Sequence, residues 1–189
     1  MKKAFTLACL LATTMFANAQ DREFKPFKVD LSTGYAVPAG SGSKAGIILA
    51  LEPKYAVTDQ IAVGLRLEAA IVARAMEDGM SAEVKAIGSY ALTGDYYFST
   101  NKSRLFAGLG AGLYQFAAAT VTEADQNTTL DESRIAAYNK FGVVPRVGAE
   151  LGHFRVGLEY NLVPKMREIK NNYFSVKLGV LIGGGKYNK

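Results

Sequence analysis

Apolar residues recur at every second position over most of the chain beyond residue 27. The clearest run lies near the C-terminus, where Phe174, Val176, Leu178, Val180 and Ile182 alternate with polar or small residues. A period of two is typical of a β-strand with two different faces, and no stretch has a clean helical period long enough for a major helix. The pattern predicts eight strands, at residues 27–37, 46–57, 61–73, 83–98, 104–116, 140–151, 154–163 and 173–183.

Charged residues provide an independent test of these strands, because all charges in a two-faced strand should share one parity. They do so in each predicted strand, as Lys28 and Asp30 illustrate. The segment 67–76 is rich in Ala and Leu, which favour a helix. A helix would scatter Arg66, Glu68 and Arg74 around its axis, whereas a strand places them on one face, so we interpret this segment as a strand.

The connections between the predicted strands alternate in length. Short ones fall at 58–60, 99–103 and 152–153, and long ones at 38–45, 74–82, 117–139 and 164–172. An even number of strands with short turns at one end and long loops at the other is the layout of an outer-membrane barrel. The sequence therefore predicts an all-β fold, an eight-stranded antiparallel up-and-down transmembrane β-barrel with both termini on the periplasmic side.

The composition of the two faces indicates which one lies inside. The charged face is otherwise mostly small, as at Gly108, Gly110 and Gly112, and a narrow lumen needs small residues opposite long charged ones. The other face has no charge over the strand cores, which suits contact with lipid. In strand 104–116, Phe106 and Phe116 share the parity of the glycines, so either the lumen holds aromatic residues there or the register is shifted by one.

The predicted lumen contains eight cations and six anions, counted over the charged parity of the strands. Since an unpaired buried charge is costly, we expect these side chains to form mutual ion pairs that plug the lumen. The predicted charge network consists of Lys28, Asp30, Glu52, Lys54, Arg66, Glu68, Lys85, Asp95, Arg104, Arg146, Glu150, Arg155, Glu159 and Lys177.

Aromatic residues of the uncharged face predict two girdles at the membrane interfaces. One would lie at the short-turn ends and one near the long loops, formed respectively by Tyr55, Tyr96, Phe98 and Phe154, and by Tyr35, Phe141, Tyr160 and Phe174.

The first residues predict a secretory signal peptide. Met1-Lys2-Lys3 is cationic, residues 4–16 are apolar, and Ala17-Asn18-Ala19 matches a small-x-small cleavage pattern. We expect cleavage between Ala19 and Gln20, which leaves residues 20–189 as one barrel domain.

Composition excludes several kinds of chemistry. Without Lys2 and Lys3 the formal charge falls from +5 to +3, which is too mild to indicate nucleic-acid binding. Cys9, the only cysteine, lies in the leader, and His153 is the only histidine, so neither a thiolate nucleophile nor a Cys-ligated or two-His metal site is expected. His153 falls in the tightest turn, which leaves catalysis without its usual base. We predict no cofactor, no metal and no enzyme activity.

Three segments resemble the strand–turn–strand units of the small OmpA- and OmpX-like outer-membrane barrel family, particularly its Bacteroidota members. They are LEPKYAVTDQIAVGLRLE at 51–68, TGDYYFSTNKSRLFAGLGAGLY at 93–114 and FSVKLGVLIGGGK at 174–186. The resemblance implies a monomer in a Gram-negative outer membrane, in contact with lipid and delivered by periplasmic chaperones and the barrel-assembly machinery. The chain departs from the family in having no appended peptidoglycan-binding domain and no terminal aromatic residue.

Variable function would lie in the long loops, which carry opposite charges. Residues 117–139 hold more acidic than basic side chains, and 164–172 the reverse, so both loops are candidates for contact with a surface ligand. We predict a non-enzymatic structural or cell-surface interaction role. The alternatives are a narrow channel or transporter for small solutes or lipids, and a soluble periplasmic binding barrel with an apolar interior.

Overall fold

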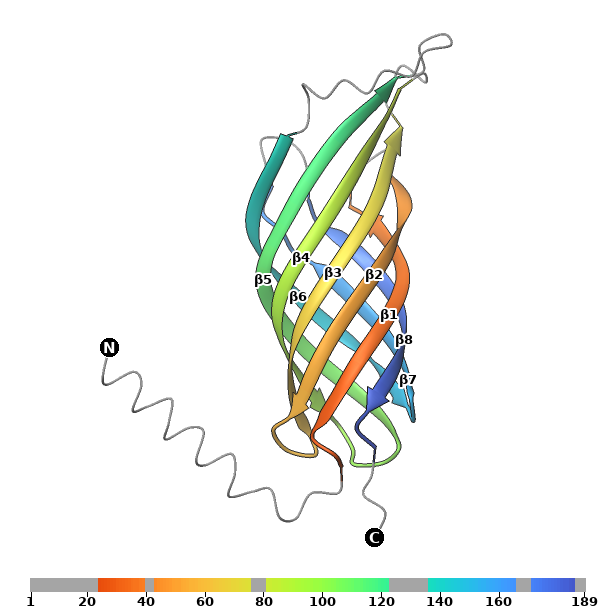
Figure 1. Ribbon diagram of the computed structural model, residues 1–189, viewed down its shortest axis with the longest axis vertical. Helices are drawn as coiled ribbons and strands as arrows, with labels where there is room; N and C mark the ends of the chain where they lie inside the picture. Colours follow the sequence, from red (N-terminus) through yellow and green to blue (C-terminus); the bar gives the residue numbers. More distant parts are fainter. Residues whose placement is uncertain (1–23, 40–42, 76–80, 123–135, 166–170, 186–189) are drawn as a thin grey trace, which may run out of the picture.

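The chain forms a closed β-barrel of eight antiparallel strands that neighbour each other in chain order (Figure 1). The computed structural model describes residues 24–39, 43–75, 81–122, 136–165 and 171–185. The strands are β1 (Phe27–Pro38), β2 (Ser43–Ala56), β3 (Ile61–Ala75), β4 (Ser81–Tyr97), β5 (Ser103–Thr122), β6 (Ala136–Leu151), β7 (Phe154–Asn161) and β8 (Tyr173–Gly183). Pairing of β1 with β8 closes the sheet, so the predicted fold class is confirmed.

The short turns, the start of β1 and the end of β8 lie at one end of the barrel, at the bottom of Figure 1. We call this the short-turn end. We call the opposite end, where β1, β3, β5 and β7 end, the loop end. One short turn is stabilised by Thr58, whose hydroxyl accepts a hydrogen bond from the Ile61 amide at 2.9 Å. In the turn between β6 and β7, Gly152 adopts a φ of 65°, a conformation that favours glycine.

Most predicted strand boundaries agree with the structure to within a few residues, and the main correction concerns β5 and β6. The predicted connection 117–139 is too long, because β5 continues to Thr122 and β6 begins at Ala136. Ala117 and Ala118 pair with Ala137 and Ala136, so hydrogen bonding to a neighbouring strand outweighs the weak strand preference of alanine. Conversely, β7 ends at Asn161, although residues 154–163 were predicted as strand.

The outer surface of the barrel is apolar. Leucine, isoleucine and valine dominate it, as Leu92 (71% exposed) and Leu178 (62% exposed) show. Every charged strand residue whose side chain the structure describes is buried, apart from the half-buried Lys140. The arrangement contradicts a soluble barrel with a charged exterior and a leucine- and valine-filled interior.

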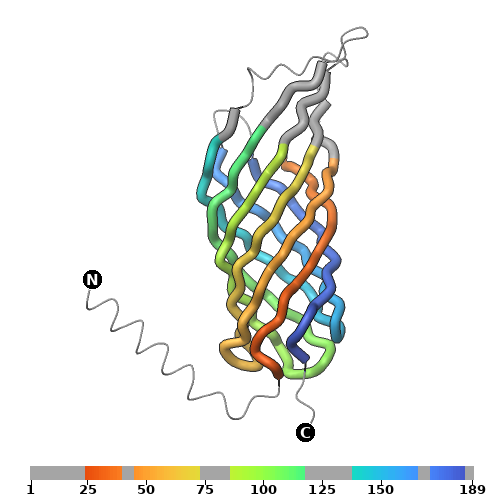
Figure 2. Tube along the Cα trace, in the orientation of Figure 1, coloured from red at the N-terminus to blue at the C-terminus, as the bar shows by residue number. Residues whose placement is uncertain are grey.

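The aromatic residues predicted to form girdles all point outward and are exposed. They include Tyr35 near the loop end and Phe154 at the short-turn end, exposed by 66% and 64%. Figure 2 traces the strands as they wind with a common tilt around one axis. Among the described residues no helix is long and apolar enough to cross a membrane.

Candidate functional site

The interior of the barrel holds almost all of the side chains predicted for the charge network. The thirteen whose side chains the structure describes are buried, with exposed fractions of 8% or less. The Lys85 side chain lies outside the described residues, as do Ala19 and Gln20 at the predicted cleavage site and most of the predicted contact loops. Because inward and outward positions alternate along each strand, charged side chains from every strand point into one enclosed space.

Glu150 organises the network nearest the short-turn end. Its carboxylate accepts hydrogen bonds from Lys28 at 2.6 Å, from Arg155 at 2.8 Å and from Arg104 at 3.0 Å. The Tyr97 hydroxyl donates a further bond at 2.6 Å. One carboxylate therefore serves three cations, which come from β1, β5 and β7.

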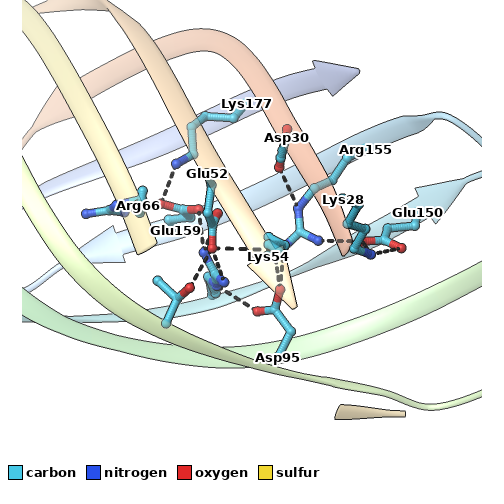
Figure 3. A network of polar contacts seen from close by, with 12 residues as sticks. Lys28, Asp30, Glu52, Lys54, Arg66, Asp95, Glu150, Arg155, Glu159 and Lys177 are labelled. Carbon is cyan, nitrogen blue, oxygen red and sulfur yellow. Dashed lines mark hydrogen bonds and ion pairs between the residues drawn. The ribbon is translucent and has the colours of Figure 1, made fainter. Parts of the chain in front are cut away.

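Asp95 and Arg146 form the centre of the network, part of which Figure 3 shows. Asp95 pairs with Lys54 at 2.5 Å, with Arg146 at 2.7 Å and with Arg155 at 2.9 Å. Arg146 also donates two hydrogen bonds to Glu52, at 2.8 and 3.0 Å. This bidentate geometry fixes both partners across the bore, since β2 and β6 are not neighbouring strands.

A third group lies farther toward the loop end. Glu159 pairs with Arg66 at 2.5 Å and with Lys177 at 2.7 Å, and Lys177 pairs with Glu68 at 2.9 Å. The Tyr173 hydroxyl donates to Glu68 at 2.7 Å. Because Arg146 reaches Glu159 at 3.8 Å and Arg155 joins Glu150 to Asp95, the three groups form one connected network.

The described interior contains seven cations and six anions, each in at least one ion pair. Taking such groups out of water is costly, and their attraction compensates only when the remaining hydrogen-bond capacity is also used. The many bidentate and shared contacts meet most of that requirement. Three buried polar atoms among the described side chains lack a hydrogen-bond partner, namely Asp30 Oδ1, Arg66 Nε and Asn161 Nδ2.

An apolar cluster fills the interior at the loop end, and sequence reasoning missed it. Phe116 stacks on Tyr138 with ring centroids 5.0 Å apart, and both lie among buried aliphatic side chains. The cluster consists of Ala36, Ile48, Ala70, Val72, Ile87, Tyr114, Phe116, Val163 and Tyr173. Its signal was present in the sequence, because Ile48, Val72 and Ile87 occupy the charged parity of their strands.

Interior aromatic residues resolve the question left open for strand 104–116. Phe106, Tyr114 and Phe116 are buried at 2%, 0% and 1% exposure, so the register is not shifted. Glycines of β6 make room for them, because a β-carbon at Gly142 would lie 2.8 Å from the Tyr114 ring and one at Gly148 2.7 Å from the Phe106 ring.

Tyr114 also joins the apolar cluster to the ion network. Its hydroxyl accepts a hydrogen bond from Arg66 at 3.0 Å and donates one to Asn161 at 2.7 Å. The ring of Tyr114 thus packs in the apolar cluster, while its hydroxyl forms hydrogen bonds with polar groups of the ion network.

His153 takes no part in the ion pairs that the structure describes, although it lines the same opening at the short-turn end as Lys28 and Glu150. It lies exposed in the turn between β6 and β7, where its Nδ1 is 3.1 Å from the Leu181 carbonyl oxygen. Within the described chain, no group of three or more His, Cys, Asp and Glu side chains is arranged to hold a metal ion.

Comparison with solved structures finds barrels of the same kind. Neisserial surface protein A superposes with a TM-score of 0.59 at 15% identity, over 87% of this chain and 99% of that one. OprG, an outer-membrane protein of Pseudomonas aeruginosa, gives a TM-score of 0.47 at 13% identity, over 89% of this chain and 99% of that one. Ail of Yersinia pestis, solved with the heparin analogue sucrose octasulfate, gives 0.47 at 15% identity over 84% of this chain and 100% of that one.

The likeness to Neisserial surface protein A supports the fold, a closed eight-stranded antiparallel barrel. No family model matches the sequence, and no curated protein matches it either. The Bacteroidota-type relationship therefore stays a prediction.

Proposed function

We propose that this chain is an outer-membrane β-barrel with a closed interior and a non-enzymatic, structural or surface-interaction role. One observation carries the proposal: the buried charges of the described strands form a connected ion-pair network inside the barrel, and the outside is apolar. Water outside the barrel would favour the reverse distribution, whereas lipid favours the observed one. The short-turn end would then face the periplasm.

Two layers support a closed rather than a conducting interior. The ion network spans the short-turn half and the middle of the bore, and the apolar cluster fills the loop-end half. A permeating ion would have to separate buried ion pairs and then cross an apolar layer, and both steps oppose flow.

Charges placed on the outer surface test the contact with lipid. Leu109 lies in β5, midway between Leu105 near the short-turn end and Leu113, which pairs with Phe141, and is 59% exposed. Leu151 lies at the short-turn end of β6 and is 50% exposed. For folding into lipid vesicles we expect Leu109→Arg to lower the free energy of unfolding by roughly 2–4 kcal/mol, and Leu151→Arg by about 0–1 kcal/mol, because the cost depends on depth in the bilayer. Equal, negligible effects would mean that water covers this face and would overturn the proposal.

Membrane residence is measured directly by cell fractionation and by heat-modifiable migration on gels. We expect the protein in the detergent-soluble membrane fraction, with a folded form that migrates differently from the boiled form. Recovery in the aqueous fraction would contradict the assignment.

Conductance in planar bilayers separates the closed barrel from the channel alternative. We expect the purified protein to give no steady conductance, since both interior layers block the bore. Large, persistent channels would favour a narrow channel or transporter instead.

A further inference from the structure

A cavity of about 500 Å³ opens at the short-turn end of the barrel. Its walls include Phe24, Lys25, Lys28, Lys102, Arg104 and Glu150, together with the backbone that follows β8. It lies where the ion network meets solvent, because Lys28, Arg104 and Glu150 belong to both.

The charge of the network is unevenly distributed along the barrel. Among the buried side chains that the structure describes, the five cations and five anions that do not line the cavity balance each other, namely Lys54, Arg66, Arg146, Arg155 and Lys177 with Asp30, Glu52, Glu68, Asp95 and Glu159. At the cavity, Lys28 and Arg104 share Glu150, and Lys25 and Lys102 add two further cations. The cavity thus has four cationic side chains and one carboxylate in its walls.

Glu150 has little capacity left for these cations. It already accepts bonds from Lys28, Arg104, Arg155 and Tyr97. Asp59, an acid of the described short-turn end, is not part of the cavity wall, and its carboxylate accepts a bond from the Phe24 amide at 3.3 Å.

The inner cations are held rigidly, and the outer ones are available. The Arg104 guanidinium lies between two rings, 3.9 Å from the centroid of Tyr97 and 4.5 Å from that of Phe24. Lys25 and Lys102 are exposed at the rim, and neither forms an ion pair with any residue in the described part of the chain. The two inner cations, Lys28 and Arg104, are fixed at the bottom of the cavity, and the ammonium groups of the two rim lysines are free at its opening. The four together suit an anion better than either pair would alone.

Glycine backbone leaves the cavity open beside these cations. Gly183, Gly184 and Gly185 have φ values of 81°, 64° and 80°, which only glycine adopts readily. This conformation bends the chain after β8 against β1, where the Gly184 amide donates to the Phe27 carbonyl at 2.8 Å. A β-carbon at Gly184 would approach the Lys28 side chain to 3.2 Å, so a larger residue would crowd the cationic wall.

We propose that this cavity binds a phosphate group. Phosphate carries up to two negative charges and several acceptor oxygens, which matches the surplus of three positive charges and the donors of Lys25 and Lys102. The volume exceeds that of a phosphate alone and leaves room for an organic substituent. The phosphate would come from a phospholipid headgroup of the adjacent leaflet or from a soluble periplasmic molecule.

The test uses the full folded protein, labelled with ¹⁵N, in octyl glucoside, a detergent without phosphate. Inorganic phosphate replaces chloride at constant ionic strength while the amide signals of Gly183, Gly184 and Gly185 are recorded. We expect saturable shifts at these glycines. The absence of saturable shifts would overturn the proposal.

Variants establish whether the rim lysines bind the anion. We expect the double variant Lys25→Gln/Lys102→Gln to weaken phosphate binding by about tenfold, because it removes two charge-assisted bonds. The double variant Lys25→Arg/Lys102→Arg keeps both charges and should retain binding, and Lys140→Gln at the other end of the barrel should leave it unchanged. Heat-modifiable migration verifies that each variant is folded, and undiminished binding by the folded glutamine variant would refute the site.

Two further ligands distinguish the source of the phosphate. Glycerol 3-phosphate represents a soluble molecule, and dihexanoylphosphatidylglycerol represents a lipid headgroup. Tighter binding of the lipid supports a headgroup site, and tighter binding of glycerol 3-phosphate supports a soluble ligand. Because inorganic phosphate binds without a bilayer, failure of this site would be distinguishable from failure of the proposed membrane function.

Discussion

The two layers of the interior close the same bore by different physics. The short-turn half and the middle hold ion pairs such as Arg146 with Glu52, and the loop-end half holds apolar contacts such as Phe116 with Tyr138. Apolar packing depends on volume and tolerates exchange of one side chain for another of similar size. Buried ion pairs depend on the presence of every partner, because removal of one leaves an uncompensated charge.

The comparison teaches that the position of a residue along the bore decides what a substitution there does. In the charged layer, neutralising one group disturbs several partners at once, since Asp95 alone has three. In the apolar cluster, a loss is confined to the side chains around the new cavity. The layers meet at Tyr114 and Tyr173, whose hydroxyls bond the charged groups while their rings pack in the cluster.

The largest effect is expected for Asp95→Asn, which keeps the shape of the side chain and removes its charge. Lys54, Arg146 and Arg155 would then share less negative charge in a buried site, at a cost of about 3–5 kcal/mol in the free energy of unfolding. Urea titration of the protein folded into vesicles measures this cost. Gln115→Ala, at an outward position of β5, is the control and should change stability by less than about 0.5 kcal/mol. A cost for Asp95→Asn as small as that of the control would show that stability does not depend on the charge of Asp95 in the network.

A smaller effect is expected in the apolar cluster. Phe116→Ala should lower the free energy of unfolding by about 3 kcal/mol, because it leaves a cavity beside Tyr138. Phe116→Leu fills most of that volume and should cost less than about 1.5 kcal/mol. The same urea titration compares the two variants. An equal cost for both would contradict the view that packing volume determines how much the apolar cluster stabilises the barrel.

The smallest effects separate two glycines that pair across β6 and β7. A β-carbon at Gly148 would lie 2.1 Å from the Val156 carbonyl oxygen and 2.7 Å from the Phe106 ring, whereas one at Gly157 would meet nothing within 4 Å. We expect Gly148→Ala to cost about 1–3 kcal/mol through crowding, and Gly157→Ala to stay within about 0.5 kcal/mol of the parent. Thermal unfolding in detergent, followed by circular dichroism, ranks the pair. A reversed ranking would mean that the β7 backbone at Val156 and the Phe106 ring both move away without cost.

The sequence alone predicted the number of strands, their order and the face that each residue occupies. These properties are local, because a period of two and the parity of the charges within one strand need no knowledge of the other strands. The parity placed Lys28, Arg66 and Glu159 on the face that the structure shows to be interior. Sequence reasoning was less accurate where strands end, since the pairing that extends β5 and β6 involves alanines with no strong preference of their own.

Only the closed barrel decided which charges meet, where the apolar cluster lies and what surrounds the cavity at the short-turn end. Lys28 and Glu150 are 122 residues apart and lie on strands that do not pair, so their contact follows from the tilt and closure of the sheet. The same closure brings Ile48 and Phe116 into one cluster, and Lys25 and Lys102 to one opening. The chain therefore encodes the face of each residue locally, whereas its height along the bore, and with it each partner, depends on the register of all eight strands.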